Sequence, residues 1–292
     1  MTPPDSSLLS IGTLRDEVSG VLARAGVPDP EVDAELLIGH VLGEGRGRIQ
    51  ALALMGSEIG ENDTARVREL TERRAAREPL QHITGRAPFR SLELAVGPGV
   101  FVPRPETEQV AQFAIDALRA VPSPEPIGVD LGTGSGAIAL AMATEVPQAR
   151  ILAVENSPEA FIWARRNVEE SGAANARVVF VDLADALPDL DGTVDVVVSN
   201  PPYIPAEAIP RDPEVRLFDP PAALYGGQDG LDVVRTISQV AQRLLHPGGT
   251  LVLEHGELQG QEIRDILTAD GWRAASTHRD LTLRDRTTTA VR

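Results

Sequence analysis

The sequence contains no cysteine and no lysine. Without cysteine the chain has no disulfide framework, no zinc–thiolate site and no thiol nucleophile. All 27 basic residues are arginines, which is typical of GC-rich coding. Against 43 acidic residues they leave a net charge of −16. This charge argues against a broad surface for nucleic-acid phosphates, so we expect no direct nucleic-acid binding.

Long apolar runs are also missing. No stretch approaches the roughly 18 residues of a membrane span, and residues 1–10 lack the charged and apolar regions of a secretion signal. The five histidines are scattered without metal-ligand spacing, so we expect no metal site. These absences predict a cytoplasmic protein without membrane contact, and we expect a monomer.

The composition, with 42% hydrophobic and 24% charged residues over 292 positions, is typical of a globular chain of two domains. Apolar residues at helical spacing in residues 14–25, 30–42 and 63–77 predict a small helical bundle over residues 1–84. The third helix interleaves arginines with glutamates, which indicates a solvated face rather than a nucleic-acid patch. Those arginines are Arg66, Arg68, Arg73, Arg74 and Arg77.

Turn-forming residues dominate the stretch after the bundle. Two short runs, residues 89–96 and 100–102, predict a β-hairpin within a linker of residues 85–103. The segment Pro-Arg-Pro-Glu-Thr, residues 103–107, then leads into a helix that ends near residue 120. An ordinary helix start accounts for Pro105, Glu106 and Glu108, and the alternative is that the two prolines stiffen the chain and hold Phe101 and Thr107 against a ligand.

Strands and helices alternate from residue 127 onward, which predicts an α/β domain over residues 104–292 with a seven-stranded doubly wound sheet. The last two strands are expected to form a hairpin at a sheet edge. Such sheets bind ligands at the carboxyl ends of their strands. The expected strands are residues 127–131, 150–155, 177–181, 194–198, 248–254, 272–278 and 287–291.

A glycine-rich loop follows the first of these strands. Its residues are Gly132, Thr133, Gly134, Ser135 and Gly136. Glycines allow a tight turn and a close backbone approach to a ligand. The dinucleotide pattern G-x-G-x-x-G has its third glycine one position later, and Asp130 would repel a pyrophosphate. The loop therefore favours a ligand that carries positive charge.

Acidic side chains end the next two strands. Glu155 lies about 20 residues beyond the loop, where a carboxylate can accept hydrogen bonds from both ribose hydroxyls. Asp182 and Leu183 follow the third strand, where they could accept from an adenine amino group and pack on its face. Each acid taken alone is equally compatible with a solvated strand end.

The buried fourth strand ends in Asn200, Pro201, Pro202 and Tyr203. The Asn200 oxygen and the Pro201 carbonyl could accept hydrogen bonds from a planar NH₂ group and hold it in line with a methyl donor. Methylation of such a nitrogen needs this alignment, because its lone pair is delocalised. The prolines stiffen the turn, and Tyr203 could stack on the planar group. An ordinary loop is the alternative interpretation of the tetrapeptide alone.

Together these residues resemble a known enzyme family. The order of the glycine loop, Glu155, Asp182 and residues 200–203 is similar to that of class I S-adenosylmethionine-dependent methyltransferases that methylate amino groups. The bundle, residues 103–107, residues 200–203 and Leu-Glu-His-Gly at 253–256 resemble the PrmC/HemK family over nearly the whole chain. Enzymes of that family N5-methylate the glutamine of the Gly-Gly-Gln motif in class 1 peptide chain release factors, and so support translation termination.

The resemblance implies S-adenosylmethionine as cofactor, S-adenosylhomocysteine as its product, and a release factor that docks on residues 1–84. It implies cofactor contacts from Gly132, Thr133, Gly134, Ser135, Gly136, Glu155, Asp182, Leu183 and Asn200. It implies that Asn200, Pro201 and Tyr203 are catalytic, and that Pro202 and Phe101 join them in binding the substrate glutamine. Two positions depart from the family: Glu155 stands where Asp is more common, and Leu183 replaces an aromatic residue of some members.

Three alternatives stay open. An adenine-N6 DNA methyltransferase shares the Asn-Pro-Pro-Tyr logic, but base flipping usually needs an added basic recognition region. A ribosomal-protein glutamine methyltransferase is closer, and the N-terminal bundle and residues 279–286 favour the release-factor interpretation over it. A non-catalytic binding module with the same fold is the third.

Two further features are open to more than one interpretation. Gly226, Gly227 and Gln228 repeat the substrate tripeptide, and we interpret the paired glycines as a turn, with self-methylation of Gln228 as the alternative. His255 is the histidine that we expect near the site, and we interpret it as structural rather than catalytic.

Overall fold

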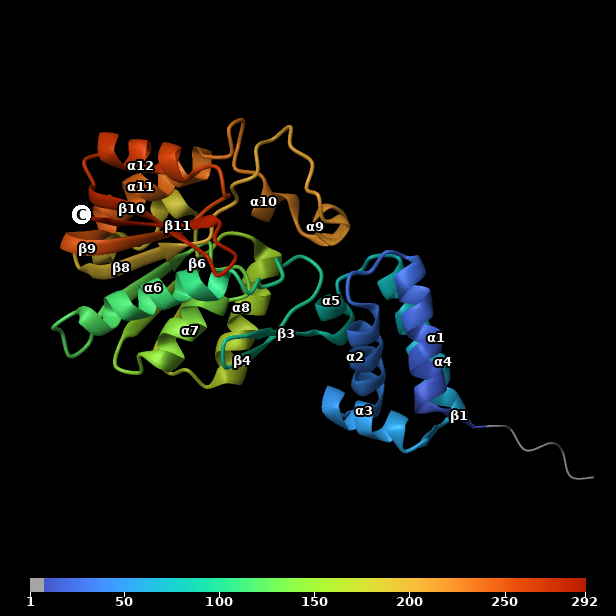
Figure 1. Cartoon of the computed structure of the whole chain (residues 1–292). Helices are drawn as coiled ribbons and strands as arrows, with labels where there is room; N and C mark the ends of the chain where they lie inside the picture. The colour runs from blue at the N-terminus through green and yellow to red at the C-terminus, as the bar shows by residue number, and fades with distance from the viewer. Residues whose placement is uncertain (1–7) are drawn as a thin grey trace, which may run out of the picture. The chain divides into compact units, whose positions relative to one another are not determined.

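The computed structural model describes residues 8–292, and the chain forms two compact units (Figure 1). The first comprises Met1–Gly85 with Arg211–Phe218, and the second comprises Arg86–Pro210 with Asp219–Arg292. The secretion-signal region considered above and the start of the expected bundle fall partly on residues 1–7, which lie outside the described residues.

The first unit is a helical bundle with a short strand pair. Its core contains Leu14, Leu22, Leu37, Ile38 and Leu70, all nearly or completely buried. The helices are α1 (Ile11–Arg24), α2 (Pro30–Leu42), α3 (Arg46–Leu54), α4 (Glu61–Ala75), α5 (Leu80–Thr84) and α9 (Pro213–Phe218), and the strands are β1 (Leu9–Ser10) and β2 (Glu58–Ile59).

The bundle differs from the sequence prediction in several respects. Residues 213–218 were expected in an irregular connection but form α9, and the strands β1 and β2 were not predicted. Helices α3 and α5 were not expected, because α3 carries Gly47 and α5 is only 5 residues long. Arg74 was expected on a solvated face, but it is 6% exposed. It is buried because its guanidinium is paired with Asp33 at 2.7 Å and with Glu214 at 2.8 Å.

The second unit begins with a hairpin of β3 (Arg86–Phe89) and β4 (Leu92–Ala95). The predicted runs, 89–96 and 100–102, were wrong as its two strands. The Gly-Pro-Gly segment at 97–99 is the stronger turn signal, but the chain turns at Arg90, which has a φ of 54°. Val100 and Val102 are instead buried outside any strand, in a small core with Val96.

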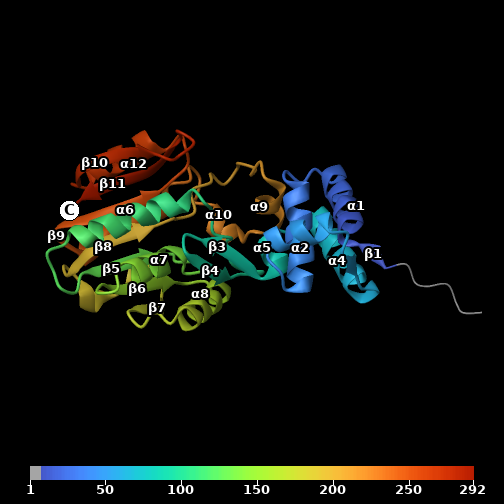
Figure 2. The same ribbon diagram turned by 60° about the horizontal axis from the view of Figure 1, so that its bottom comes forward.

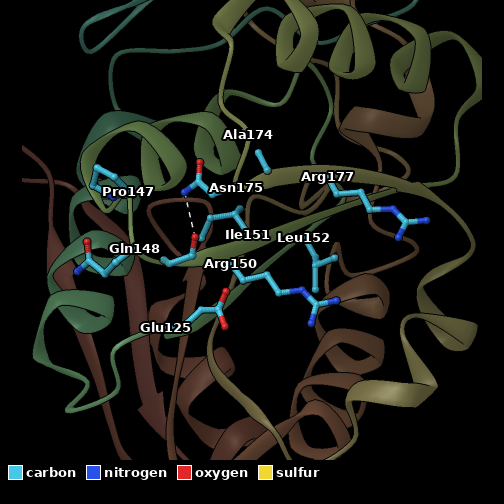
Figure 3. A pocket seen from close by; sticks show the side chains of 11 residues that line it. Glu125, Pro147, Gln148, Arg150, Ile151, Leu152, Ala174, Asn175 and Arg177 are labelled. Atoms are coloured by element: carbon cyan, nitrogen blue, oxygen red, sulfur yellow. Dashed lines mark hydrogen bonds between the residues drawn. The ribbon is translucent and has the colours of Figure 1, made fainter.

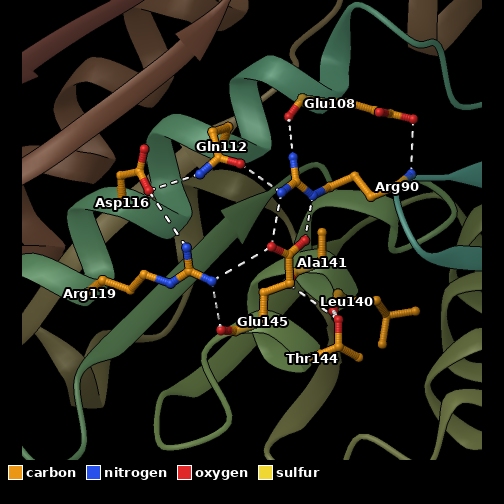
Figure 4. Close-up of polar contacts among 9 residues, drawn as sticks. All are labelled: Arg90, Glu108, Gln112, Asp116, Arg119, Leu140, Ala141, Thr144 and Glu145. Atoms are coloured by element: carbon orange, nitrogen blue, oxygen red, sulfur yellow. Dashed lines mark hydrogen bonds and ion pairs between the residues drawn. The ribbon is translucent and has the colours of Figure 1, made fainter.

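Arg90 also anchors the hairpin tip. Its guanidinium donates to Glu145 of α7 (Ala137–Glu145) at 2.5 Å and to Gln112 of α6 (Thr107–Ala120) at 2.7 Å (Figure 4). Its backbone N–H donates to the Glu108 carboxylate at 2.9 Å. The hairpin is therefore bonded to the first turns of α6, where the site residue Thr107 lies.

Among residues 8–292, seven strands form one sheet, as predicted, in the order β10-β11-β9-β8-β5-β6-β7 (Figure 2). The strands from β9 to β7 are parallel, and β10 and β11 form the predicted antiparallel hairpin at the edge. The strands are β5 (Ile127–Leu131), β6 (Arg150–Glu155), β7 (Ala176–Phe180), β8 (Val194–Ser199), β9 (Leu245–Glu254), β10 (Arg273–Arg279) and β11 (Asp285–Val291).

Helices cover both faces of this sheet, α6 and α7 on one and α11 (Asp232–Leu244) and α12 (Gly260–Ala269) on the other (Figure 1). The side chains of β8 therefore alternate between the two faces. Val196 and Val198 pack toward α6 and α7, and Val197 packs toward α11 and α12. The remaining elements are α8 (Pro158–Ser171), α10 (Pro221–Leu224) and the 3₁₀ turns η1 (Leu183–Asp185) and η2 (Pro188–Leu190).

Asp195 is the one charged residue in the apolar strand β8, and its partners account for it. Its carboxylate accepts from the backbone N–H of Ile127 at 2.7 Å and lies 3.1 Å from His246 Nε2. These bonds join the amino ends of β5 and β8. Within residues 8–292, no helix combines the length and the apolar character needed to cross a bilayer.

Candidate active site

The predicted site residues follow four neighbouring strands. The glycine loop leaves β5, Glu155 ends β6, Asp182 comes after β7 and Asn200 comes after β8. The chain passes from β5 to β6 and β7 on one side and returns to β8 and β9 on the other. The carboxyl ends of β5 and β8 therefore flank the topological switch point, where open α/β sheets bind ligands.

The glycine loop adopts backbone conformations that favour glycine. Gly132, Gly134 and Gly136 have φ angles of 73°, 59° and 86°, in the left-handed region that other residues avoid. The backbone N–H groups of Gly132 and Thr133 both donate to the carbonyl of Val154 at 2.9 Å. The loop is thus bonded to β6, and Gly136 immediately precedes α7.

Glu155 is part of the same structure. Its carboxylate accepts backbone N–H bonds from Gly134 at 2.8 Å, from Asn156 at 3.0 Å and from Ser157 at 2.8 Å. Burial raises the pKa of Glu155, although these three bonds act to lower it. The side chain that we expect to bind ribose is therefore held against the glycine loop in the free protein.

Asp130 lies beneath the loop and is 1% exposed. One carboxylate oxygen accepts from the Thr133 hydroxyl at 2.6 Å and from the Ala139 N–H at 3.1 Å. The other, Oδ1, is buried and has no hydrogen-bond partner within residues 8–292. Burial raises the pKa of Asp130 to about 7. An unpaired buried carboxylate here suits a cationic ligand, because a positive charge would offset its desolvation.

The predicted adenine contacts are less enclosed. Asp182 is exposed, and its carboxylate accepts from the Ala184 N–H and from the Asn156 amide, both at 3.0 Å. These bonds, the Ala184 bond first, lower the pKa of Asp182. Leu183 is half-buried and packs against the core beneath α11 and α12.

The segment of residues 200–203, called the clamp below, continues β8. Pro201 is buried, and Asn200, Pro202 and Tyr203 are half-buried. The Gln259 amide donates to the Tyr203 carbonyl at 2.9 Å. Burial, with a smaller contribution from the nearby Glu254, raises the pKa of Tyr203 to about 12. Tyr203 therefore offers a neutral aromatic ring.

Phe101, the fifth predicted substrate contact, is half-buried. The Arg104 guanidinium lies 5.2 Å from the centre of its ring and is paired with Asp219 at 2.9 Å. A cation at this distance from an aromatic face attracts the ring, so Arg104 of the Pro-Arg-Pro segment contributes to the position of Phe101.

Three site residues were missed or undervalued by sequence reasoning. The Asn200 amide donates to the Thr107 hydroxyl at 3.3 Å, and Glu254 lies next to both. Asn167 of α8 is 2% exposed and donates to the Ser135 carbonyl at 2.9 Å. The two hydrogen bonds join residues 93 and 32 positions apart, so no local pattern signals them.

His255 is buried, as a structural role requires. One ring nitrogen lies 2.9 Å from the Thr288 hydroxyl and the other 2.9 Å from the Gly256 carbonyl. Burial lowers the pKa of His255, which favours the neutral ring. No cluster of potential metal ligands occurs within residues 8–292.

A hollow of about 260 Å³ lies at the amino ends of β6 and β7 (Figure 3). Glu125, Gln148, Arg150 and Arg177 line it together with backbone and apolar groups. It contains none of the predicted site residues, and it lies at the edge of the sheet opposite to the switch point. We therefore place the candidate site at the carboxyl ends of the strands.

Comparison with known proteins identifies the family. The family model described as the PrmC N-terminal domain matches residues 13–85, and the methyltransferase small domain matches residues 92–219. A release factor glutamine methyltransferase of Streptomyces coelicolor is 52% identical over 271 residues, which are 92% of this chain and 93% of the relative. The chain belongs to the release factor glutamine methyltransferase family.

Two other matches extend this result. A 4-amino-L-phenylalanine/4-methylamino-L-phenylalanine methyltransferase of Streptomyces pristinaespiralis is 40% identical over 95% of this chain and 93% of its own length. The crystal structure of a methyltransferase from Pyrococcus furiosus matches with a TM-score of 0.51 and 20% identity, over 69% of this chain and 89% of that chain. The fold is that of class I methyltransferases, and family and fold imply the use of S-adenosylmethionine.

Proposed function

We propose that the protein transfers a methyl group from S-adenosylmethionine to the side-chain nitrogen N5 of the glutamine in the Gly-Gly-Gln motif of class 1 release factors. The reaction would take place in the cytoplasm and support translation termination. The observation that carries the proposal is the position of Asn200, which leaves β8 next to the glycine loop at the switch point of the sheet. The 52% identical relative supports glutamine as the target.

The clamp would act by alignment. Asn200 Oδ1 and the Pro201 carbonyl would each accept one N–H of the substrate amide, which turns the face of its nitrogen toward the methyl donor. The same two acceptors would stabilise the positive charge that the nitrogen gains during transfer. Tyr203 and Phe101 would pack on the planar amide and keep water out. When bound, S-adenosylmethionine supplies an activated methyl group, so the chain needs no strong base.

The residues at the carboxyl ends of the strands fit this cofactor. We propose that the glycine loop approaches its methionine part, that Glu155 accepts from its ribose hydroxyls, and that Asp182 and Leu183 contact its adenine. Asp130 supports the assignment, because its buried Oδ1 lacks a partner within residues 8–292 and the cofactor carries both an ammonium and a sulfonium group.

The helical bundle would dock the release factor. We propose residues 1–84 for this role and residues 104–292 for catalysis, with residues 85–103 as the linker. The match of residues 13–85 to the PrmC N-terminal domain supports a family-specific role for the bundle.

A second candidate substrate is a small aromatic amine. The relative that methylates 4-amino-L-phenylalanine by name is 40% identical over 95% of this chain. An aniline nitrogen is planar and conjugated like that of glutamine, so the clamp would accept either. The higher identity of the release-factor relative, 52%, makes glutamine the first choice.

A methyl-transfer assay separates these candidates. Purified protein is incubated with tritiated S-adenosylmethionine and a release factor, a release factor with the motif glutamine changed to alanine, 4-amino-L-phenylalanine, ribosomal proteins or adenine-containing DNA. We expect label in the intact release factor and none in its alanine variant. Label in any other substrate, with none in the release factor, would overturn the proposal. Loss of transfer in Asn200→Ala would assign the reaction to this site.

A further inference from the structure

Asn200, Thr107 and Glu254 meet beneath the clamp, although they come from three different elements. Ser199 of β8 pairs with Leu253 of β9 in parallel register, so the next residues on the two strands, Asn200 and Glu254, are neighbours. Thr107 begins α6, which packs on both strands. Thr107 is 4% exposed and Glu254 is 3% exposed.

The hydrogen bonds among these three residues fix the orientation of the Asn200 amide. Its Nδ2 donates to the Thr107 hydroxyl at 3.3 Å. Hydrogen bonding from the Thr107 side chain, and to a smaller extent from that of Asn200, acts to lower the pKa of the neighbouring Glu254 carboxylate. A carboxylate can only accept, and Thr107 has a single hydroxyl hydrogen to donate. The NH₂ group of Asn200 must therefore point toward Thr107 and Glu254.

From this geometry we infer that Glu254 is a positioning residue that acts with Thr107 to keep Asn200 Oδ1 turned toward the substrate nitrogen. The two orientations of an amide have the same shape, so only hydrogen bonds distinguish them. With its NH₂ group engaged by Thr107 and Glu254, Asn200 offers its oxygen to the substrate. In the flipped orientation the NH₂ group of Asn200 would face the NH₂ group of the substrate. The inference rests on the proposed function only for the identity of that substrate.

A purely structural role does not account for Glu254. Its second oxygen, Oε2, is buried and has no hydrogen-bond partner within residues 8–292. A buried carboxylate in such surroundings is costly, and an apolar or amide side chain would cost less. The charge is accounted for by the requirement that the Asn200 and Thr107 groups meet a side chain that, while ionised, accepts hydrogen bonds and donates none.

The charged groups around Glu254 set when it is ionised. Burial raises the pKa of Glu254 to about 7, against the hydrogen bonds from Thr107 and Asn200. Arg286 of β11 acts to lower the pKa, and Glu106, which precedes α6, acts to raise it. Tyr203 and His255 are its neutral neighbours. As the pH falls through about 7, the carboxylate becomes a donor and stops enforcing the orientation.

Kinetic tests compare Glu254→Gln with wild type. Gln keeps the shape but can present its own NH₂ to Asn200, so we expect kcat for release-factor methylation to fall about 100-fold. The Kd of S-adenosylhomocysteine should change much less than kcat, by less than about threefold, since Glu254 reaches the cofactor only through Asn200, one of its nine predicted contacts. Wild-type kcat should rise between pH 6 and 8, and that of Glu254→Gln should not. A variant with wild-type kcat and the same pH profile would overturn the inference.

Two variants of Thr107 form a matched pair for a second test. Thr107→Val removes the hydroxyl at constant shape and should lower kcat as Glu254→Gln does, whereas Thr107→Ser keeps the hydroxyl and should retain kcat within about twofold. Equal kcat in the valine and serine variants would contradict the inference. This pair also keeps the test decisive if Glu254→Gln does not fold.

Amide exchange tests the orientation without any substrate. The side-chain NH₂ signal of Asn200, assigned by its loss in Asn200→Asp, should exchange with solvent about tenfold faster in Glu254→Gln and Thr107→Val than in wild type. Unchanged exchange in both variants would overturn the inference. Protected exchange in a wild type that labels no release factor would instead mean that the proposed function fails and the positioning role holds.

Discussion

Glu155 accepts a hydrogen bond from the backbone N–H of Gly134 at 2.8 Å, which joins the end of β6 to the centre of the glycine loop. The same carboxylate accepts from Asn156 and Ser157. The two features that we predict to bind the methionine part and the ribose of the cofactor are thus one structure. Order in the loop before binding lowers the entropy cost of binding.

The first prediction concerns this carboxylate. In Glu155→Gln an NH₂ group must face at least one of the three backbone N–H donors, so we expect S-adenosylhomocysteine to bind about 30-fold more weakly. Glu155→Asp keeps the charge and should bind more tightly than Glu155→Gln. Isothermal titration measures both. Asp185→Asn, at an exposed carboxylate of η1, is the control and should leave the Kd unchanged. Equal affinity in wild type and Glu155→Gln would contradict the ribose assignment.

Asn167 gives the second prediction. Its side chain accepts from the Ala95 N–H at 2.7 Å and donates to the carbonyls of Ala95 and Ser135, both at 2.9 Å. Asn167→Ala leaves these buried backbone groups without partners and should lower the free energy of unfolding by about 3 kcal/mol. Cofactor affinity should fall with it, because Ser135 belongs to the glycine loop. Urea denaturation measures the loss.

The control for Asn167 lies on the same helix. Glu169 has a side chain that is 69% exposed, so Glu169→Ala should change stability by less than about 0.5 kcal/mol. If Asn167→Ala were as stable as Glu169→Ala, the three bonds of Asn167 would not stabilise the fold.

The third prediction concerns the buried charges of the first unit. Glu214 accepts from Arg74 at 2.8 Å and from Arg77 at 2.6 Å and 2.8 Å. Burial opposes ionisation, but the hydrogen bonds that the Arg77 and Arg74 side chains donate hold the pKa of Glu214 below its ordinary value. Its stabilisation is therefore present above the unfolded pKa, near 4.5, and is lost as the pH falls below it.

Glu214→Gln removes the carboxylate that Arg74 and Arg77 share and leaves Arg74 paired with Asp33 alone, so we expect a loss of about 3 kcal/mol in the free energy of unfolding at pH 7. Thermal unfolding at pH 7 and pH 4 tests this, and the difference from wild type should shrink at the lower pH. Glu207→Gln, at an exposed position, is the control. A difference that stays constant with pH would show that shape rather than charge is responsible.

The sequence predicts features that depend on residues adjacent in the chain and misses those that depend on contacts between distant residues. Strand β8 and the clamp were predicted because the apolar run and the prolines lie side by side in the chain. The turn at Arg90 was misplaced, since it is stabilised by Glu108, Gln112 and Glu145 rather than by a turn-forming residue.

The same reasoning explains the hidden part of the site. Thr107 and Asn200 are 93 positions apart, and only the packing of α6 on the sheet brings them into contact. Glu254 stood out in the sequence only as part of Leu-Glu-His-Gly. That Glu254 forms no close ion pair within residues 8–292 becomes visible only when the neighbouring elements are in place.

The fourth prediction separates packing from chemistry in residues 226–228. A Cβ on Gly226 would lie 2.4 Å from the Pro202 carbonyl oxygen, so this glycine is required by the close approach of the clamp backbone. Gln228 is exposed. We expect Gly226→Ala to disrupt the clamp and lower kcat strongly, and Gln228→Ala to keep wild-type activity. Intact mass after incubation with cofactor alone should stay unchanged; a gain that disappears in Gln228→Ala would establish self-methylation.

The fifth prediction follows from the buried carboxyl of Glu254. Its pKa rises from 4.5 to about 7 on folding, so the folded protein holds a proton that the unfolded chain has released. Stability from this group is present below pH 4.5 and is lost as the pH rises to 7, a cost of about 3 kcal/mol at pH 8.

Glu254→Gln removes this cost and should be more stable than wild type at pH 8, with a smaller gain at pH 5. Burial also raises the pKa of Asp130, so part of the loss of stability with rising pH should persist in the variant. Urea denaturation at both pH values measures the difference, with Glu257→Gln, an exposed neighbour, as control. If Glu254→Gln loses methylation while its free energy of unfolding rises, Glu254 is retained for the reaction. If the variant loses methylation and is also less stable than wild type at pH 8, the prediction that the ionised carboxylate destabilises the fold is wrong.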